Sequence, residues 1–251
     1  MPWHGPDQAR IYYEDAGRGE AVLLMPGWGG SIAEFGELRQ ELAGGFRVVA
    51  ADLPGSGRSQ PQPRRYTSGY YTDDAHVLLG LLDALGVGAA HLVGSSDGGE
   101  EALLMAALAP SRALSAVTWG AAGQIVASPG QLDEVAHALD RPDGPFKVLA
   151  AYLAEAYGPA GARIMTETWA QAMREIIGAG GDVSRSRAPL ITCPALLIAG
   201  FGDQLCPPGL VRDMAGAIPR GRYLEADGGH DLYQSHRGWL MSTVIGWLSS
   251  H

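Results

Sequence analysis

The chain has 251 residues, of which 46% are hydrophobic, and a formal net charge of −9. That length suits one α/β domain with an insertion, and the composition supplies a sizeable core. The acidic balance, with no basic block anywhere, excludes nucleic acid and anionic membranes as expected partners.

The start of the chain and the cysteine content indicate the compartment. The first five residues, Met-Pro-Trp-His-Gly, lack the charged start and apolar stretch of a secretory signal, and no apolar run reaches transmembrane length. The two cysteines, Cys193 and Cys206, are too few for a disulfide framework and stand in no zinc-type spacing. We therefore expect a cytoplasmic protein without a metal site.

Short apolar runs alternate with helical patterns along the chain. Leucines at helical spacing between 78 and 85 end at Gly86, which would cap a helix, and apolar residues recur in the same way between 240 and 248. Such alternation predicts a mostly parallel sheet with helices on both faces. The expected strands are Arg10–Glu14 and Ala21–Met25, read as a pair around a Gly17-Arg18-Gly19 turn, then Phe46–Ala51, Ala90–Val93, Leu114–Gly120, Ala195–Gly200 and Arg222–Glu225.

One region interrupts the alternation. Between 121 and 188 strand signals vanish, and helices are expected over Gln131–Leu139, Lys147–Ala156 and Arg163–Ile177. An elongated crossover is one interpretation, but a single helix would suffice for that. We expect instead a helical cap of residues 121–188 over a core formed by residues 1–120 and 189–251.

A glycine-flanked serine follows the fourth predicted strand. Residues 94–99 read Gly-Ser-Ser-Asp-Gly-Gly, and Ser96 has glycine two residues before and two residues after it. This G-x-S-x-G pattern between a strand and a helix is typical of a nucleophile elbow, in which a strained turn exposes the serine beside the amides of a helix N-terminus. An ordinary glycine-rich turn is the alternative.

Three further loops follow predicted strands. Pro26-Gly27-Trp28-Gly29-Gly30 could turn a backbone amide toward the serine, or could be a plain turn. Asp203 follows a buried strand, and His230 follows the last strand. Serine, aspartate and histidine in that order, each at a strand's carboxyl end, are what a hydrolytic triad on an open sheet requires. Asp227 and Asp231 are alternative acids, but neighbours on the same turn rarely face the far nitrogen of the imidazole. Asp52, in Asp52–Ser59, is expected to anchor backbone.

Together these segments resemble the α/β-hydrolase fold family, in its order and over nearly the whole chain. The resemblance implies Ser96 as nucleophile, His230 as general base and then acid, and Asp203 as the orienting carboxylate. It also implies an oxyanion hole from the backbone amides of Trp28 and Asp97, and a variable cap that shapes the substrate pocket. No metal or organic cofactor is implied.

Three departures refine the resemblance. Serine rather than aspartate at position 96 argues against the haloalkane dehalogenase and epoxide hydrolase branches, and Pro26 stands where many members carry histidine. Asp97 after the nucleophile resembles the biphenyl-hydrolase-like (valacyclovir hydrolase-like) serine hydrolases, which include amino-acid ester hydrolases. Its carboxylate could pair with a substrate ammonium group. Alternatively, it caps the following helix near its positive end.

The expected activity is hydrolysis of a small carboxylic ester, including α-amino acid esters, through an acyl-enzyme. A lactonase, a thioesterase or a carbon–carbon bond hydrolase could use the same triad, because fold does not fix function. A third possibility is a ligand receptor that keeps the triad without turnover. The residues expected to bind substrate are Trp28 and Asp97, together with Trp119, Phe146, Trp169 and Met173, which could instead be core.

Overall fold

The computed structural model describes residues 2–251 and is built on an eight-stranded sheet in the order β1-β2-β4-β3-β5-β6-β7-β8. The strands from β3 to β8 are parallel, whereas β2 is antiparallel to both of its neighbours. The strands are β1 Trp3–His4, β2 Ile11–Gly17, β3 Ala21–Met25, β4 Arg47–Ala51, β5 Ala90–Ser95, β6 Ala113–Trp119, β7 Ala195–Gly200 and β8 Gly221–Ala226.

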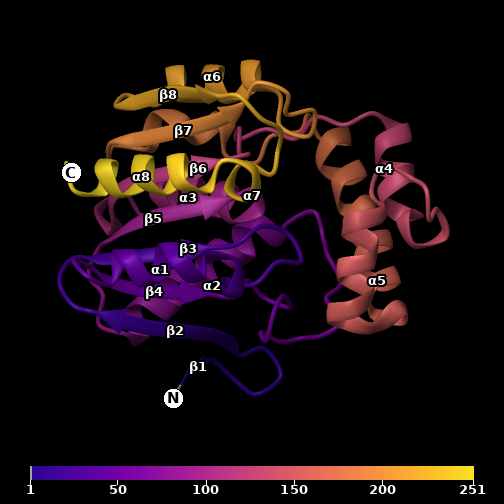
Figure 1. The fold of residues 1–251 in the computed structure, drawn as a ribbon, viewed down its shortest axis with the longest axis horizontal. Helices are drawn as coiled ribbons and strands as arrows, with labels where there is room; N and C mark the ends of the chain where they lie inside the picture. The colour runs from indigo at the N-terminus through magenta and orange to yellow at the C-terminus, as the bar shows by residue number, and fades with distance from the viewer. Residues whose placement is uncertain (1) are drawn as a thin grey trace.

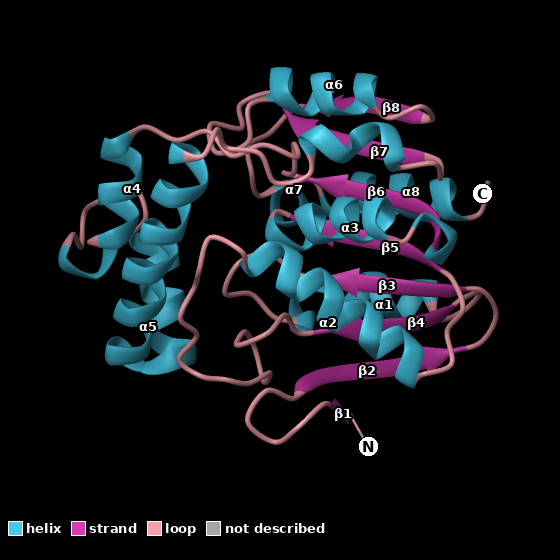
Figure 2. Ribbon diagram, turned by 180° about the vertical axis from the view of Figure 1, so that it is seen from behind, coloured by secondary structure: helices cyan, strands magenta, loops and turns pink. Residues whose placement is uncertain are grey.

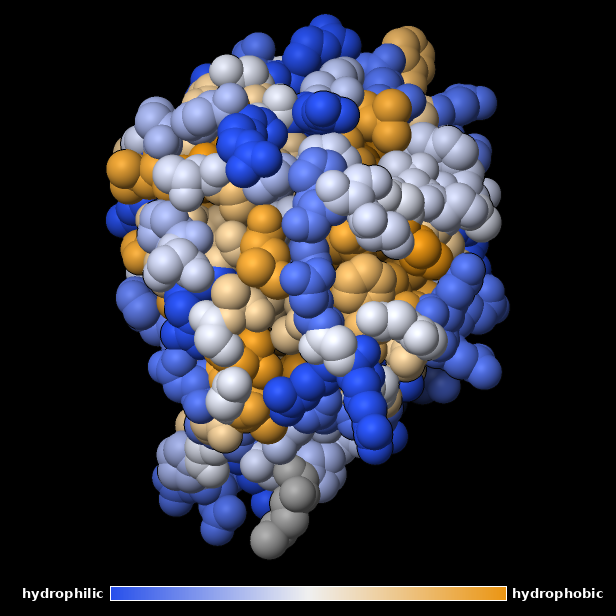
Figure 3. Space-filling view, turned by 90° about the vertical axis from the view of Figure 1, so that its left-hand side faces the viewer, coloured by the Kyte–Doolittle hydropathy of each residue, from blue (hydrophilic) through white to orange (hydrophobic). Residues whose placement is uncertain are grey.

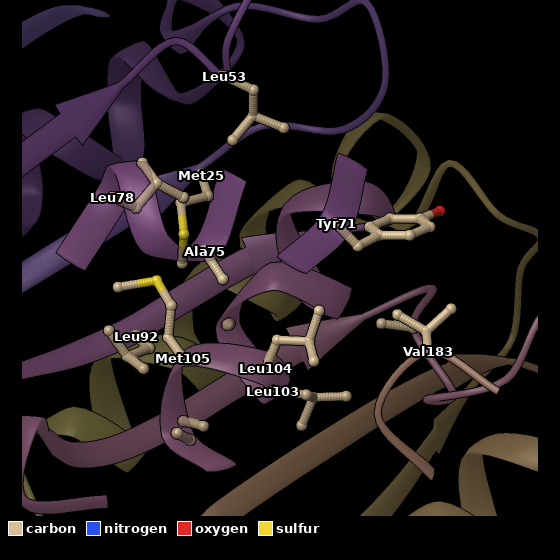
Figure 4. Close-up of a cluster of buried hydrophobic side chains, with 14 of the residues drawn as sticks. Met25, Leu53, Tyr71, Ala75, Leu78, Leu92, Leu103, Leu104, Met105 and Val183 are labelled. Carbon is tan, nitrogen blue, oxygen red and sulfur yellow. The ribbon is translucent and has the colours of Figure 1, made fainter. Parts of the chain in front are cut away.

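Helices cover both faces of this sheet, as the sequence predicts. In β3, Leu23 and Met25 pack in one apolar cluster while Val22 and Leu24 pack in the other, because successive side chains of a strand point to opposite faces. Met25 lies among residues of α2 and α3 in the first cluster (Figure 4). The covering helices are α2 Tyr70–Ala84, α3 Asp97–Leu108 and α6 Pro208–Ala217 on one face (Figure 2), and α1 Gly36–Leu42, α7 Leu232–Ser235 and α8 Arg237–Leu248 on the other (Figure 1).

The first two long strands are not partners, so the predicted pairing around the Gly17-Arg18-Gly19 turn is wrong. β4 lies between them and pairs antiparallel with β2 and parallel with β3. A Cβ on Gly17 would come 2.1 Å from the carbonyl oxygen of Phe46, just before β4, which shows how closely that strand approaches the turn. Turn residues alone do not reveal that a later strand inserts.

The segment between β6 and β7 stands apart from the sheet as a helical layer (Figure 1). It contains α4 Pro129–Ala136, a 3-10 turn at Ala138–Asp140, and α5 Lys147–Gly178. The two helices predicted at Lys147–Ala156 and Arg163–Ile177 are the two halves of α5, which bends at Gly158 (φ +71°) before Pro159. The parallel strands point their carboxyl ends toward this layer (Figure 2).

The surface away from the helical layer is mixed in character. On the left-hand side of Figure 1, hydrophilic residues surround small hydrophobic groups (Figure 3). Across residues 2–251, no helix combines the length and apolar character that crossing a bilayer requires.

Candidate active site

Ser96 occupies the sharp turn that joins β5 to α3. Its φ of +52° and ψ of −119° make it the one non-glycine residue of the described chain with a positive φ. Such a conformation is costly for an L-residue, and it persists where surrounding structure fixes it. The amide of Ser96 donates to the carbonyl oxygen of Trp119 at 2.8 Å, which ties the turn to the end of β6.

The two glycines of the elbow are required by close backbone approaches. A Cβ on Gly94 would lie 2.1 Å from the carbonyl oxygen of Gly98, and a Cβ on Gly98 would lie 2.4 Å from that of Met25. Both distances are far inside van der Waals contact. The two glycines of the G-x-S-x-G pattern are therefore needed because the start of α3 packs closely against β5 and the end of β3.

The structure brings the three predicted triad residues together from three loops. His230 Nε2 lies 3.0 Å from Ser96 Oγ, and His230 Nδ1 lies 2.8 Å from Asp203 Oδ2. The imidazole packs over Gly120, where a Cβ would come 2.8 Å from its Cε1 atom. The turn after β7 holds Asp203, whose Oδ1 accepts hydrogen bonds from the amides of Leu205 (2.9 Å) and Cys206 (2.8 Å).

The other two acids do not take this place. Asp227 and Asp231 are both exposed, while the Asp203 side chain is 1% exposed and faces the imidazole. Burial lowers the pKa of His230, but the hydrogen bond and the charge of Asp203 outweigh burial and leave the pKa above its ordinary value. The aspartate thus favours the imidazolium that forms whenever the histidine takes up a proton.

The loop after β3 lies directly against the serine. Gly27 to Gly30 form a tight turn in which the amide of Gly30 donates to the carbonyl oxygen of Gly27 at 3.0 Å. A Cβ on Gly27 would sit 3.2 Å from Ser96 Cβ, so the turn abuts the nucleophile. Within the described chain, the amides of Trp28 and Asp97 donate to no other protein group. Two donors are therefore free beside Ser96.

The side chain of Asp97 is held by two tyrosines. Its two carboxylate oxygens accept hydrogen bonds from the hydroxyls of Tyr70 (2.7 Å) and Tyr71 (2.9 Å), at the start of α2. Burial raises its pKa to about 6, although the tyrosine hydrogen bonds oppose the shift. Asp97 is the first residue of α3, but no side-chain bond caps that helix. The tyrosines, which sequence reasoning missed, hold the carboxylate instead.

The predicted pocket residues fall into two groups. Trp119 is 1% exposed and packs with Phe35 and Tyr233 in the cluster under α1 and α8, so its assignment to the pocket is wrong. Met173 is 0% exposed within the other cluster and is likewise a core residue. Both side chains therefore fit the alternative prediction from the sequence, that they are core residues.

Of the remaining pocket residues, Trp28, Phe146 and Trp169 are partly exposed, whereas Asp97 is buried. Trp169 of α5 stacks on Trp28, with ring centroids 4.7 Å apart, so the helical layer contacts the loop beside the nucleophile. Phe146 precedes the first turn of α5 and is partly buried. The contact between Trp28 and Trp169 joins α5 to the loop that follows β3.

Two buried acidic side chains accept hydrogen bonds from the backbone of loops near the site. Asp52 accepts hydrogen bonds from the amides of Ile32 (2.7 Å) and Arg58 (2.8 Å), which confirms its predicted anchoring of backbone. Glu100, which the sequence did not single out, accepts from the amides of Ala122 (2.7 Å) and Gly123 (2.9 Å). It thereby fastens the nucleophile helix to the loop that leads into the cap.

Comparisons with known proteins agree with this arrangement. A family model described as alpha/beta hydrolase fold matches residues 20–144. Serine hydrolase BPHL from Homo sapiens is 32% identical over 209 residues, covering 79% of this chain and 68% of that protein. A Burkholderia cepacia 2-hydroxy-6-oxo-6-phenylhexa-2,4-dienoate hydrolase is 36% identical over 123 residues, covering 47% of this chain and 42% of that protein.

Among solved structures, a thermophilic esterase from Thermogutta terrifontis superposes with a TM-score of 0.74 at 25% identity. The match covers 96% of this chain and 94% of the esterase. One assignment follows from the strand order of the sheet, from the serine elbow with histidine and aspartate beside it, and from the identity and coverage of the human relative. The chain belongs to the α/β-hydrolase fold family of serine hydrolases.

Proposed function

We propose that the protein hydrolyses small carboxylic esters, including α-amino acid esters, through an acyl-enzyme on Ser96. The observation that carries this proposal is the hydrogen-bonded series Ser96–His230–Asp203, with contacts of 3.0 and 2.8 Å. A cytoplasmic location and the absence of nucleic-acid and membrane partners stay predictions from the sequence, which leaves the oligomeric state open.

In the proposed mechanism each residue of the series has its own step. As Ser96 Oγ attacks the ester carbonyl, its proton passes to His230 Nε2, while Asp203 accepts the hydrogen bond from Nδ1–H. The carbonyl oxygen becomes an oxyanion and binds the free amides of Trp28 and Asp97. His230 then protonates the leaving alkoxide, and afterwards takes a proton from the water that releases the acid.

The Asp97 carboxylate supports the preference for α-amino esters. It is 5% exposed and belongs to the residue that follows the nucleophile, yet its known donors are two neutral hydroxyls. Each carboxylate oxygen can accept a further hydrogen bond. A substrate ammonium would add a charged donor in a low-dielectric site and would favour the ionised carboxylate.

A carbon–carbon bond hydrolase is the second candidate. The observation that favours it is the 36% identity to the Burkholderia cepacia dienoate hydrolase over 123 residues. Asp97 opposes this candidate, because the carboxylate of a dienoate substrate would be repelled by a buried negative charge nearby.

The test is turnover of p-nitrophenyl esters of plain acids and of α-amino acids by wild type, Ser96→Ala and Asp97→Asn. We expect turnover that Ser96→Ala abolishes and a preference for amino esters that Asp97→Asn removes. Turnover that survives in Ser96→Ala would contradict the nucleophile assignment. An unchanged preference in Asp97→Asn would contradict the ammonium site.

A further inference from the structure

A tyrosine of the cap forms a hydrogen bond with the backbone of the loop that lies beside Ser96. Tyr157, in the first half of α5, donates its hydroxyl hydrogen to the carbonyl oxygen of Gly29 at 2.7 Å. The same hydroxyl oxygen accepts a hydrogen bond from the amide of Gly57 at 2.7 Å. Its neighbour Leu153 presses on the same loop, because a Cβ on Gly29 would come 2.7 Å from Leu153 Cδ2.

These bonds continue through the turn to the oxyanion donor. In a trans peptide the carbonyl and the N–H of one plane point in opposite directions, and the planes of this turn are trans. The plane that receives the Tyr157 bond on Gly29 O carries the Gly30 N–H, which donates to Gly27 O at 3.0 Å. The plane of Gly27 O carries, on its opposite side, the free Trp28 N–H.

All the donors in this series point the same way. The series runs from Gly57 N–H to the Tyr157 hydroxyl, then through the two peptide planes to the Trp28 N–H beside Ser96. Hydrogen bonds aligned in this sense polarise one another, so each outer member strengthens the innermost donor. They also fix the orientation of the planes, and an oxyanion hole depends on donors that are oriented before reaction.

We propose that Tyr157 is a positioning residue that orients and polarises the Trp28 amide of the oxyanion hole. The inference rests on the proposed function, in which that amide binds the oxyanion. It assigns the cap a part in the chemistry in addition to shaping the pocket. Burial raises the pKa of Tyr157, so the hydroxyl keeps its proton and remains a donor at neutral pH.

The test compares Tyr157→Phe with Tyr152→Phe. Both tyrosines lie in the first half of α5 and line one cavity of about 340 Å³, but the Tyr152 hydroxyl is outside the hydrogen-bonded series. Each variant is treated with a fluorophosphonate. Ser96 Oγ bonds to phosphorus as the phosphorus–fluorine bond breaks, the serine proton passes to His230, and fluoride leaves, while the phosphoryl oxygen occupies the oxyanion hole. The end point of labelling gives the folded fraction, and the rate gives the reactivity of that fraction.

We expect Tyr157→Phe to lower both the labelling rate and kcat for the best ester about tenfold. This loss is smaller than that expected from deleting a direct donor to the oxyanion. KM should stay unchanged, and Tyr152→Phe should match wild type. A Tyr157→Phe rate within about twofold of wild type would overturn the proposal, as would an equal loss in both variants or a loss confined to KM.

Labelling separates this proposal from the substrate assignment. If wild type is labelled at Ser96 but hydrolyses no ester, the proposed function fails, and a lower rate in Tyr157→Phe still supports the positioning role. If wild type is not labelled at Ser96, both fail.

Discussion

Replacing Asp203 with asparagine should remove activity by trapping His230 in the wrong tautomer. Oδ1 of the aspartate accepts from the amides of Leu205 (2.9 Å) and Cys206 (2.8 Å), while Oδ2 faces His230 Nδ1 at 2.8 Å. An asparagine that turned its amide nitrogen toward the two backbone donors would leave both unpaired, at a cost of about 1–3 kcal/mol each. Its carbonyl oxygen must therefore stay with the backbone, and its NH₂ group must face the histidine.

The consequence for the imidazole follows directly. Because the NH₂ group donates, Nδ1 must be unprotonated, so the neutral ring carries its proton on Nε2, facing Ser96 Oγ at 3.0 Å. That nitrogen can no longer accept the serine proton. Loss of the correct tautomer in a serine triad lowers kcat about 10⁴-fold, and at 1.36 kcal/mol per tenfold change this is about 5.4 kcal/mol.

The assay is the rate of ester hydrolysis and of fluorophosphonate labelling at neutral pH, with thermal unfolding to verify the fold. Asp231→Asn is the matched control, since it removes a carboxylate next to His230 in sequence that makes no contact with the ring nitrogens. The control should stay within about threefold of wild type, a change below 1 kcal/mol. Asp203→Asn activity above about a tenth of wild type would refute the tautomer argument.

Four other outcomes follow from the site. Activity should rise with pH through a midpoint above 6.5, because Asp203 raises the pKa of His230 and the unprotonated ring is the base; a midpoint below 6.5 would contradict this. The preference for amino esters, measured as kcat/KM for an amino ester divided by kcat/KM for a plain ester, should weaken below about pH 6, where Asp97 is protonated. In Asp97→Asn this ratio should not depend on pH in that range. Gly98→Ala should abolish labelling of Ser96, since its Cβ would lie 2.4 Å from the Met25 carbonyl oxygen, and undiminished labelling would refute the clash. Glu100→Ala leaves two buried amides unpaired and should lower the free energy of unfolding by about 2–6 kcal/mol in urea titration; a loss below about 1 kcal/mol would show that water replaces the carboxylate.

The fold and the proximity of Ser96, His230 and Asp203 could be predicted because their signals are local. The spacing of Gly94 and Gly98 reflects the close backbone contacts of the turn around Ser96. Asp203 and His230 each follow an apolar run that forms a strand. Parallel strands then gather their carboxyl ends at one edge of the sheet, whatever the details of packing. Such inferences need the order of elements and little else.

What could not be predicted depends on contacts between distant segments. Tyr157 is 100 residues from Gly57, and the hydroxyls of Tyr70 and Tyr71 reach Asp97 only through the packing of α2 on α3. Trp119 lies near the end of the predicted strand Leu114–Gly120, but the sequence pattern does not show on which face of the sheet its side chain lies. That face is the one covered by α1 and α8.

The buried carboxylate of Asp97 also bears on how a reaction cycle ends. Its pKa of about 6 leaves it mostly ionised at pH 7. Hydrolysis of a plain ester produces an acid that ionises beside Ser96, so two negative charges then share a site where charges are poorly screened. Repulsion should speed departure of that product and keep product inhibition weak. An α-amino acid product, whose ammonium would pair with Asp97 in the proposed site, should leave more slowly.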